Sequence, residues 1–520
     1  MWYRLWGQAT PTYPQTSDVS YTYDGGSRLR ATMVDASGTS QYQYDERDRL
    51  VQYKPPKPAG HDWIMYEYNN LDQKTSVNNE WNVTEYSYYA NGWLKQVTYG
   101  LPAATYTYDQ VGNRTRVGRM NGTYTLYQYD TDPRYRLTSI EHRRQYPSDV
   151  LLGTISYSSR DDSGNPLSVT DWDGTVGYTY DGNNRLDSAT GADYNYDWVG
   201  NRLNPPADPN AMVYDATDKL VTWPGQHQYT YYPTGSIYQQ KDSGGTAQKT
   251  YTYTGAELLE SVTHAGVANP STMVWDGDSN RVSFTSSTGG TTEFVYDPTA
   301  GIPAVIQEAS PSAYVYYVRE PNGALLMRDD GSTFHHYHFD ALGSTRMITD
   351  YQGNVTDTYA YDAWGKLTDH TRNTGSIDQP YMYVGQLGYY SHYQDSNLDL
   401  LQLGVRFYDP ETGRFTQIDP IRDGLGPYTY VENTPLTAVD PTGLVRWTCK
   451  RKKPPGWLPN PWKTRGKHDW CYGCRLACIE HCIDKYLGDS CKYEECEERC
   501  WNAYNSCLLR KCCTFQITDP

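Results

Sequence analysis

A short motif recurs along most of the chain: an aromatic residue, any residue, Tyr, Asp, a turn and then a basic residue. Successive copies begin about 20 residues apart, so the fold must be an array of similar units. The clearest copies lie at 21–25, 42–46, 106–114, 127–130, 178–185 and 194–202, and degenerate copies lie at 66–69, 86–89 and 229–232. The phase residues Asp24, Asp45, Asn69, Tyr89, Asp109 and Asp130 are separated by 21, 24, 20, 20 and 21 residues.

Each copy has the chemistry of a β-hairpin. Tyr-x-Tyr places two rings on one face of a strand, because side chains alternate with a period of two. The Asp-x-x-Gly-Asn that follows favours a turn, since Gly and Asn tolerate positive φ and Asp bonds to its own backbone. The basic residue then begins a second extended stretch. More than a dozen such units predict one very long antiparallel sheet.

Such a sheet must curl or close, because long open edges aggregate. The chain has 52 Tyr against 7 Phe, and a Tyr ring packs while its hydroxyl reaches water or a partner. This bias indicates a wall that is wetted on both faces. We therefore predict a mainly β protein whose sheet curls into a hollow shell. A β-propeller of about 40 residues per blade, or stacked β-sandwiches, is the alternative.

The cysteines and the charge divide the chain at nearly the same place. All 11 cysteines lie between Cys449 and Cys513. Residues 445–520 carry 14 basic and 9 acidic side chains, net +5, whereas the remainder carries 31 and 52, net −21. Dense Cys in a short segment indicates an oxidising compartment or a bound metal. A large acidic body is thus followed by a small basic, Cys-rich tail.

No apolar run approaches the 18 residues of a membrane span, and residues 1–7 lack the features of a signal peptide. We expect a bacterial protein that is secreted or held at the cell surface, and that leaves the cell by a non-classical or upstream-encoded route. The chain could equally be a piece of a longer protein.

The repeats resemble the YD repeats of the RHS (rearrangement hot spot) family. The resemblance covers about 1–444 and is most specific at 335–444, the RHS-repeat-associated core. It implies a hollow β-cocoon that encloses a variable C-terminal toxin, which the core cuts free, as in the C components of insecticidal toxin complexes. The matching core motifs lie at 339–346, 361–365, 406–415, 419–420, 428–435 and 440–444.

This resemblance divides the chain into four parts. Residues 1–334 would form the shell, and 335–444 the core with its cleavage motif. Residues 445–470 would be a basic arm rich in Pro and Trp, and 471–520 a small Cys-rich helical domain. The arm suits a membrane interface or a phosphate backbone, and a solvated linker is the alternative.

The family's cleavage signature places the cut between Leu444 and Val445, where the composition also changes. The signature residues here are Pro435, Asp440, Pro441 and Gly443.

Hydrolysis of an amide needs an activated water and an acid, and two close carboxylates supply both because one of them keeps a proton. Asp419 and Asp440 are the predicted pair, with Asp423 as a second choice. Arg406, thirteen residues before Asp419 as in the family pattern, would keep one carboxylate ionised or polarise the scissile carbonyl. The alternative is that these Asp-Pro and Pro-Thr-Gly segments are turns and that Arg406 is an ion-pair partner.

The tail has cysteines at helical spacing, so each set would lie on one helix face. The pattern predicts a helical hairpin with two disulfides, a staple that so small a core needs. At least one thiol is left over, and a zinc site is the runner-up. The cysteines of this pattern are Cys474, Cys478, Cys482, Cys496 and Cys500.

A motif at 468–472 resembles the H-D-x-C-Y core of calcium-dependent secreted phospholipases. The resemblance implies that His468 deprotonates the attacking water and that Asp469 binds calcium. The family's preceding Cys pair and its Gly-rich calcium loop are missing. The alternative is that both residues cap a helix.

Two functions compete. The first is a polymorphic-toxin protein for interbacterial competition or host intoxication, with a single-turnover aspartyl autoprotease in its core. Its expected partners are an acidic immunity protein, secretion-system or toxin-complex components, its own released segment and a target membrane. Nucleic acid is a rival target, although no nuclease motif is recognisable. The second function is a cell-surface carbohydrate-binding protein that releases nothing.

Overall fold

The computed structural model describes residues 18–26, 28–56, 63–79, 82–131, 134–203, 211–311, 313–421 and 426–448. Regular structure in these ranges is almost entirely antiparallel β-sheet, with 41 strands and two short 3₁₀ helices. No described helix has the length and hydrophobicity needed to cross a membrane. Most of the expected arm and the whole Cys-rich helical domain lie outside the described residues.

The first sheet has 17 strands, and each pairs antiparallel with the next along the chain. A separate pair, β18 (Asn195–Tyr196) and β19 (Arg202–Leu203), follows it. The strands of the first sheet are β1 (Ser20–Tyr23), β2 (Arg30–Asp35), β3 (Gly38–Tyr44), β4 (Leu50–Lys54), β5 (Ile64–Tyr68), β6 (Lys74–Asn78), β7 (Val83–Tyr88), β8 (Leu94–Tyr99), β9 (Leu101–Tyr108), β10 (Arg114–Arg119), β11 (Thr123–Tyr129), β12 (Leu137–Arg144), β13 (Val150–Arg160), β14 (Pro166–Asp171), β15 (Gly174–Tyr180), β16 (Leu186–Ala189) and β17 (Ala192–Asp193).

The second sheet has 16 strands in the same sequential antiparallel order. Its strands are β20 (Val213–Tyr214), β21 (Leu220–Trp223), β22 (His227–Tyr231), β23 (Ile237–Asp242), β24 (Ala247–Tyr253), β25 (Leu259–His264), β26 (Ser271–Trp275), β27 (Arg281–Thr285), β28 (Thr291–Tyr296), β29 (Val305–Ser310), β30 (Ala313–Arg319), β31 (Leu325–Asp329), β32 (Phe334–Phe339), β33 (Thr345–Thr349), β34 (Val355–Tyr361) and β35 (Leu367–Arg372). This sheet runs on without a break across the boundary expected at 334/335.

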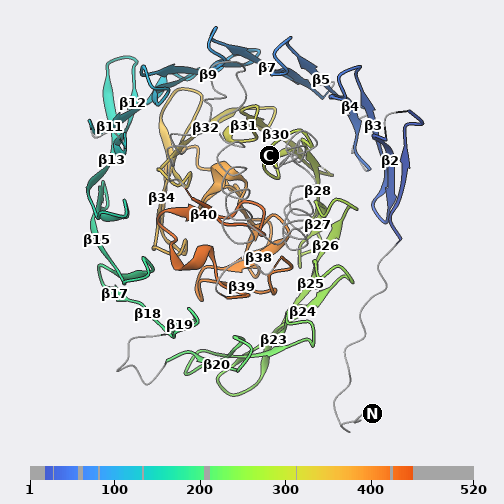
Figure 1. Ribbon diagram of the computed structural model, residues 1–520, viewed down its shortest axis with the longest axis vertical. Coiled ribbons are helices and arrows are strands. Elements are labelled where there is room, and N and C mark those ends of the chain that lie inside the picture. Colours follow the sequence, from blue (N-terminus) through green and yellow to red (C-terminus); the bar gives the residue numbers. More distant parts are fainter. Residues whose placement is uncertain are drawn as a thin grey trace, which may run out of the picture.

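The rest of the described chain forms short elements inside the ring of strands (Figure 1). They are η1 (Gly385–Leu387), β36 (Tyr390–Ser391), β37 (Leu401–Leu403), β38 (Arg406–Asp409), β39 (Arg414–Phe415), η2 (Val431–Asn433), β40 (Ala438–Val439) and β41 (Trp447–Thr448).

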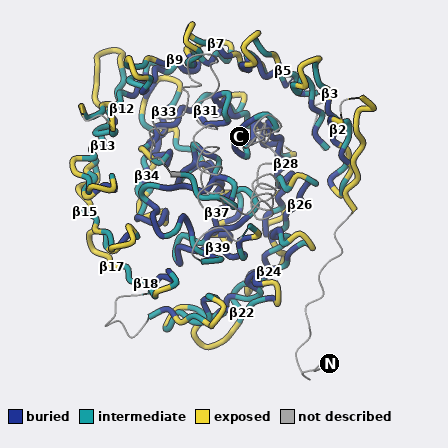
Figure 2. The backbone as a smooth tube through the Cα atoms, viewed as in Figure 1, coloured by how far each residue is buried: buried dark blue, intermediate teal, exposed yellow. Residues whose placement is uncertain are grey.

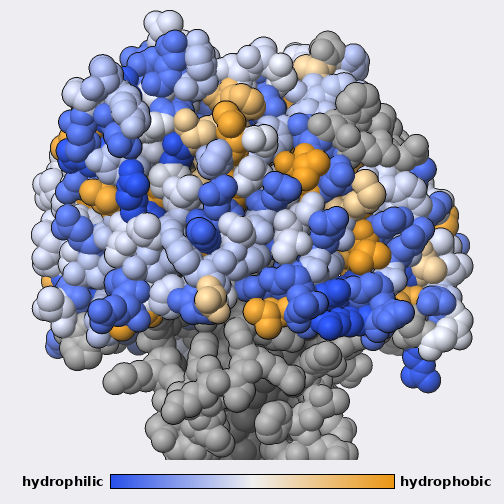
Figure 3. Space-filling view, turned by 90° about the horizontal axis from the view of Figure 1, so that it is seen from above, coloured by the Kyte–Doolittle hydropathy of each residue, from blue (hydrophilic) through white to orange (hydrophobic). Residues whose placement is uncertain are grey.

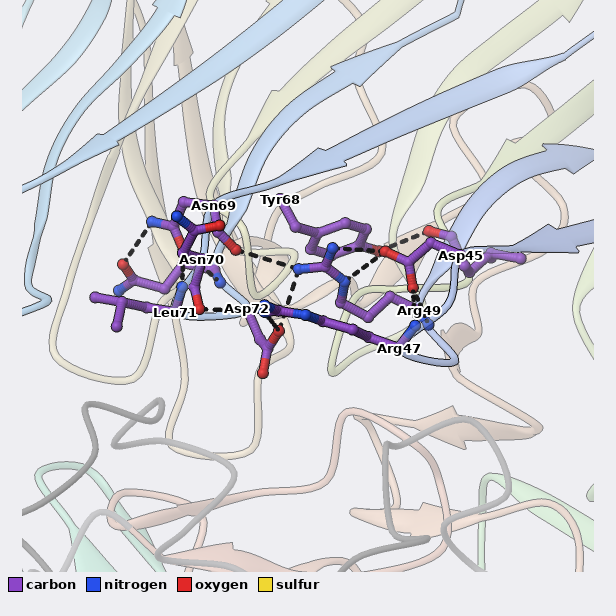
Figure 4. A network of polar contacts seen from close by, with 10 residues as sticks. Asp45, Arg47, Arg49, Tyr68, Asn69, Asn70, Leu71 and Asp72 are labelled. Carbon is purple, nitrogen blue, oxygen red and sulfur yellow. Dashed lines mark hydrogen bonds and ion pairs between the residues drawn. The ribbon is translucent and has the colours of Figure 1, made fainter.

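One repeat shows why the sequence makes these hairpins (Figure 4). The Asp45 carboxylate accepts hydrogen bonds from the backbone N–H groups of Arg47 and Arg49, at 2.9 and 3.0 Å, and from Arg49 Nε at 2.7 Å. The Arg49 guanidinium lies 4.8 Å from the ring centroid of Tyr68 in the next repeat. The same two backbone bonds, to the second and fourth residues after the acid, recur at Asp109, Asp181, Asp197, Asp215, Asp276, Asp340, Asp350 and Asp362.

The preference for Tyr has a different cause from the hydration that we inferred. The hydroxyl of the second Tyr in a repeat donates to a backbone carbonyl oxygen of the preceding hairpin. Examples are Tyr68 to Leu50 at 2.8 Å and Tyr108 to Leu94 at 2.8 Å. Phe cannot make this bond, so the hydroxyl ties each hairpin to the one before it. The same bond is made by Tyr88, Tyr129, Tyr180, Tyr196, Tyr214, Tyr231, Tyr296 and Tyr361.

The two large sheets follow one another in a spiral. The first sheet, coloured blue to teal, forms the outer turn, and the second completes the ring and then passes inside it (Figure 1). Exposed residues gather on the outer turn and buried residues on the inner strands (Figure 2). The predicted curled shell is therefore confirmed, and a propeller of separate blades is excluded for the described residues.

The seam where the outer and inner turns meet is both apolar and ionic. Met33, Ile64 and Val97 of the outer turn share one hydrophobic cluster with Ile306 and Leu326 of the inner turn. Ion pairs join the same turns: Lys74 Nζ lies 2.7 Å from Asp297 Oδ2, and Arg114 Nη2 lies 2.6 Å from Glu320 Oε2. These contacts, together with the apolar burial, hold the spiral closed.

Candidate active site

Three predicted residues gather around one guanidinium. Arg406 begins β38 and is buried, with an exposed fraction of 3%. Its Nη2 lies 3.3 Å from Asp419 Oδ2 and 3.4 Å from Asp440 Oδ2. Both carboxylates are also buried, with exposed fractions of 5% and 3%. The fold thus brings together residues that are up to 34 positions apart in the sequence.

Asp440 also reaches the predicted scissile bond. Its Oδ1 accepts hydrogen bonds from the backbone N–H groups of Leu444 and Val445, both at 3.1 Å, and from Thr442 Oγ1 at 3.2 Å. The nitrogen of Val445 is the leaving group if the bond after Leu444 is cut. One carboxylate oxygen therefore lies beside that nitrogen while the other faces Arg406.

The backbone on both sides of this bond is fixed. Gly443 has φ +67°, and a Cβ there would lie 2.1 Å from the carbonyl oxygen of Leu403, so only Gly fits. Arg406 Nε donates to the carbonyl oxygen of Gly443. After the bond, Trp447 in β41 pairs with Val439 in β40. The predicted cleavage site thus lies in the loop of a short hairpin.

Arg406 contacts the carbonyl of the residue before Leu444. Of the two roles expected for this guanidinium, the geometry favours holding the carboxylates and the loop over polarising the scissile carbonyl. Its carbon Cζ also lies 3.7 Å from the ring centroid of Phe415.

The electrostatics of the site favour a proton on Asp440. Burial raises the pKa of Asp440 to about 6, although Arg406 opposes the rise, and the nearby charge of Asp419 adds to it. Burial lowers the pKa of Arg406, against the attraction of both carboxylates, and a guanidinium still stays charged at neutral pH. Asp440 can therefore carry a proton close to neutral pH, as a general acid must.

Sequence reasoning missed Tyr389. Its hydroxyl oxygen accepts the backbone N–H of Asp440 at 2.6 Å and lies 2.9 Å from the hydroxyl of Tyr430. Both rings are fully buried, so this pair fixes the backbone from which the Asp440 carboxylate extends. Tyr430 stands in the motif at 428–435, but no signal in the sequence links Tyr389 to Asp440.

The remaining predicted residues divide into two groups. The signature residues Pro435 and Pro441 are buried, and Pro441 directly follows Asp440. Asp423, His468, the tentative calcium ligand Asp469 and the five patterned cysteines lie outside the described residues. Within the described ranges, no group of three or more His, Cys, Asp or Glu side chains is arranged to hold a metal ion.

Several toxins are similar to this chain. It is 24% identical over 493 residues to Double-stranded DNA deaminase toxin A of Burkholderia cenocepacia, covering 84% of this chain and 33% of that protein. It is 25% identical over 431 residues to Toxin protein Tse5 of Pseudomonas aeruginosa, covering 79% and 29%. The tRNA nuclease WapA of Bacillus subtilis is 27% identical over 272 residues, covering 50% and 11%. The chain therefore spans a third or less of the length of these relatives.

A solved structure has the same fold. The crystal structure of TcdB2-TccC3-TEV matches with a TM-score of 0.63 at 17% identity, covering 82% of this chain and 25% of the solved chain. The family model described as Teneurin YD-shell matches residues 164–430, slightly more than half of this chain, and this range includes Arg406 and Asp419. The chain is thus an RHS/YD-repeat protein and belongs to the Teneurin YD-shell family.

Proposed function

We propose that this chain is the shell and self-cleaving core of a polymorphic toxin. The shell would enclose the segment that follows Leu444, and the core would release that segment by cutting once before Val445. The observation that carries the proposal is the contact of the Asp440 carboxylate with the Val445 nitrogen, beside Arg406 and a second carboxylate. The toxin names of the relatives support the same reading of the whole protein.

The proposed reaction is a hydrolysis. Asp419, ionised beside Arg406, takes a proton from a water molecule, whose oxygen bonds to the carbonyl carbon of Leu444. Once the carbonyl carbon is tetrahedral, the nitrogen of Val445 has a free lone pair; Asp440 gives its proton to that lone pair, and the C–N bond breaks. The products are a carboxyl group on Leu444 and an amino group on Val445. Each shell cuts one bond, so the reaction has a single turnover.

The first prediction tests the two carboxylates. Asp419→Asn and Asp440→Asn should each give one uncut chain on a denaturing gel, because either change removes the base or the acid. The unchanged protein should give a body ending at Leu444 and a fragment of 76 residues. Asp409→Asn is the matched control: this half-buried acid ends β38, and its carboxylate accepts hydrogen bonds from the Glu411 backbone N–H and the Thr412 hydroxyl, so its variant should be cut fully. Complete cutting of Asp419→Asn at Leu444 would remove Asp419 from the mechanism.

A carbohydrate-binding role without release is the weaker proposal. On the face shown in Figure 3, hydrophobic residues form small separate spots among hydrophilic ones. The most exposed large rings, Trp198 at 95% and Tyr146 at 67%, lie far apart in the sequence on different hairpins. Sugar recognition would be favoured by a single intact chain that binds glycans, whereas two fragments on the gel favour the toxin.

What the released segment does stays a proposal from its sequence. Either a calcium-dependent phospholipase using His468 or a disulfide-bonded membrane-disrupting domain would act at a target membrane. We further propose secretion with toxin-complex or secretion-system partners, and an immunity protein in the producing cell. Loss of killing in His468→Ala of the full chain, with cleavage unchanged on the gel, would favour hydrolysis, and unchanged killing would favour disruption.

A further inference from the structure

The two turns of the spiral meet over three buried imidazoles. His142 lies on β12 of the outer turn, and His336 and His338 lie on β32 of the inner turn; each has an exposed fraction of 0%. The rings of His142 and His338 are nearly perpendicular, with centroids 5.1 Å apart. We call these three residues the histidine seam.

Strand β32 presents two different faces. Tyr337 and Phe339 belong to the inner hydrophobic cluster. Because side chains alternate along a strand, His336 and His338 lie on the opposite face, toward the outer turn. The apolar part of the seam between the turns is therefore followed by a polar, titratable part.

The three rings of the histidine seam make few hydrogen bonds, and their partners are uncharged Thr hydroxyls. His142 Nδ1 lies 3.1 Å from Thr125 Oγ1, and His338 Nε2 lies 3.0 Å from Thr349 Oγ1. The other four ring nitrogens, including both of His336, have no hydrogen-bond partner among the described residues. Nothing in this arrangement would stabilise an additional positive charge.

The charged groups that act on these rings are all basic. Arg119 on β10 acts on all three, Arg346 acts on His142, His335 acts on His336, and His142 and His336 act on His338. Arg119 itself donates from Nη1 to Thr125 Oγ1 at 2.9 Å, and the titratable groups near it are Tyr106 and Tyr127. Among the described residues, no carboxylate contributes to the environment of the three rings.

Burial and these neighbouring cations lower the pKa of His142 and of His336 to about 3, and lower the pKa of His338 well below its usual range. The seam is therefore closed only with neutral imidazoles. When the turns separate, each ring returns to the ordinary pKa of about 6.5. The separated state thus binds protons more strongly, and acid favours it.

We propose that the histidine seam is an acid-sensitive closure, and that lowering the pH below about 6.5 shifts the shell toward a form that is open between β12 and β32. Each pH unit below 6.5 shifts the equilibrium toward the open form about tenfold per imidazole, or up to about a thousandfold for all three. The inference stands on the seam and goes beyond the proposed self-cleavage. It adds a condition under which an enclosed segment leaves the shell.

Other seam groups titrate in different ways. Burial raises the pKa of Asp297, but Lys74 overcomes this effect and keeps it below the usual range, so their ion pair survives mild acid. Protonation of Asp276 has the opposite effect from protonation of the three histidines. Burial and then Asp278 raise its pKa to about 7, so its protonation stabilises the folded shell as the pH falls. Comparing variants with the unchanged protein cancels these shared contributions.

The test is hydrogen–deuterium exchange of the full chain at pH 7.5 and pH 5, corrected for the intrinsic exchange rate. Peptides from β11–β13 and β32–β33 should exchange faster at pH 5, by up to about 30,000-fold if all three imidazoles are protonated in the open form, whereas peptides from β22–β25 should not. His336→Phe removes an imidazole that makes no hydrogen bond, and it should reduce the acceleration about thirtyfold. The triple variant H142F/H336F/H338F should abolish it.

His264→Phe is the matched control, because this buried histidine lies on β25 away from the seam; its variant should keep the full acceleration. If the triple variant folds poorly at pH 7.5, His336→Phe alone decides. Equal acceleration in His336→Phe and the unchanged protein, or no acceleration in the seam peptides, overturns the proposal. Running the uncut Asp419→Asn chain in parallel separates opening, seen by exchange, from cleavage, seen on the gel.

Discussion

Asp440 has one oxygen beside the Val445 nitrogen and the other beside Arg406, and its pKa near 6 sets a pH dependence. If it is the acid, the cleavage rate should fall as the pH rises through about 6, because the protonated form is lost. The unchanged full-length chain, collected in denaturant before it folds and then refolded by dilution into buffers of pH 5 to 8, should therefore be cut faster at pH 5.5 than at pH 7.5. A rate that rises over this range would contradict the assignment.

The same raised pKa also makes the free energy of unfolding depend on pH. Because the folded value lies above the ordinary one, Asp440 contributes stability at low pH, and this contribution is lost as the pH rises through about 6. The site is thus destabilised near neutral pH.

At the residue scale, Arg406, Asp419 and Asp440 could be named from the sequence because they stand in recognisable motifs. Tyr389 could not be named, since its contact with Asp440 joins positions 51 apart. No local pattern marks a hydroxyl whose role is to accept one backbone N–H.

At the scale of the hairpin, the Tyr hydroxyls that tie neighbouring repeats predict a measurable difference between two Tyr→Phe changes. Tyr108→Phe removes the 2.8 Å bond to the Leu94 carbonyl, which should cost about 1 kcal/mol of unfolding free energy. Tyr337→Phe is the control, because the buried Tyr337 hydroxyl has no hydrogen-bond partner among the described residues; this change should be neutral or stabilising. The measurement is the urea unfolding midpoint. Equal shifts of the midpoint in the two variants would show that the Tyr hydroxyl bond does not stabilise neighbouring hairpins.

The hairpins were predictable because their signals are local. Asp45 and Arg49 fix one turn within five residues, so reading the sequence finds each unit. The end of the first sheet at β17 was not predicted. The continuation of the second sheet through β32 was not predicted either, because the motifs of the core overlap strands that belong to the wall.

At the scale of the whole molecule, the buried ion pair of Lys74 and Asp297, both only 6% exposed, fastens the two turns. Lys74→Met should cost about 3–5 kcal/mol, because it leaves Asp297 buried without a cation. Adding Asp297→Asn should recover most of that loss. Lys366→Met breaks the exposed pair with Glu411 and should cost at most about 1 kcal/mol. Urea unfolding midpoints compare the variants, and equal costs for the two lysines would show that the seam pair does not fasten the shell.

The sequence predicted only that the long sheet must curl. It did not predict that the sheet forms a spiral or which strands meet. Its contacts join residues far apart, such as Arg30 and Asp278, which are 248 positions apart. Repeats of 20 residues carry no information about which turn will lie over which.

The long separations across the seam also set the order of events on the ribosome. Each hairpin can form as soon as about 20 residues emerge, but Lys74 meets Asp297 only 223 residues later. At about 5–20 residues per second, the apolar inner face of the first sheet stays uncovered for roughly 10 to 45 s. Met33, Ile64 and Val97 are uncovered throughout this interval. A chaperone is therefore needed while the chain is still being translated, before the second sheet exists to cover the first.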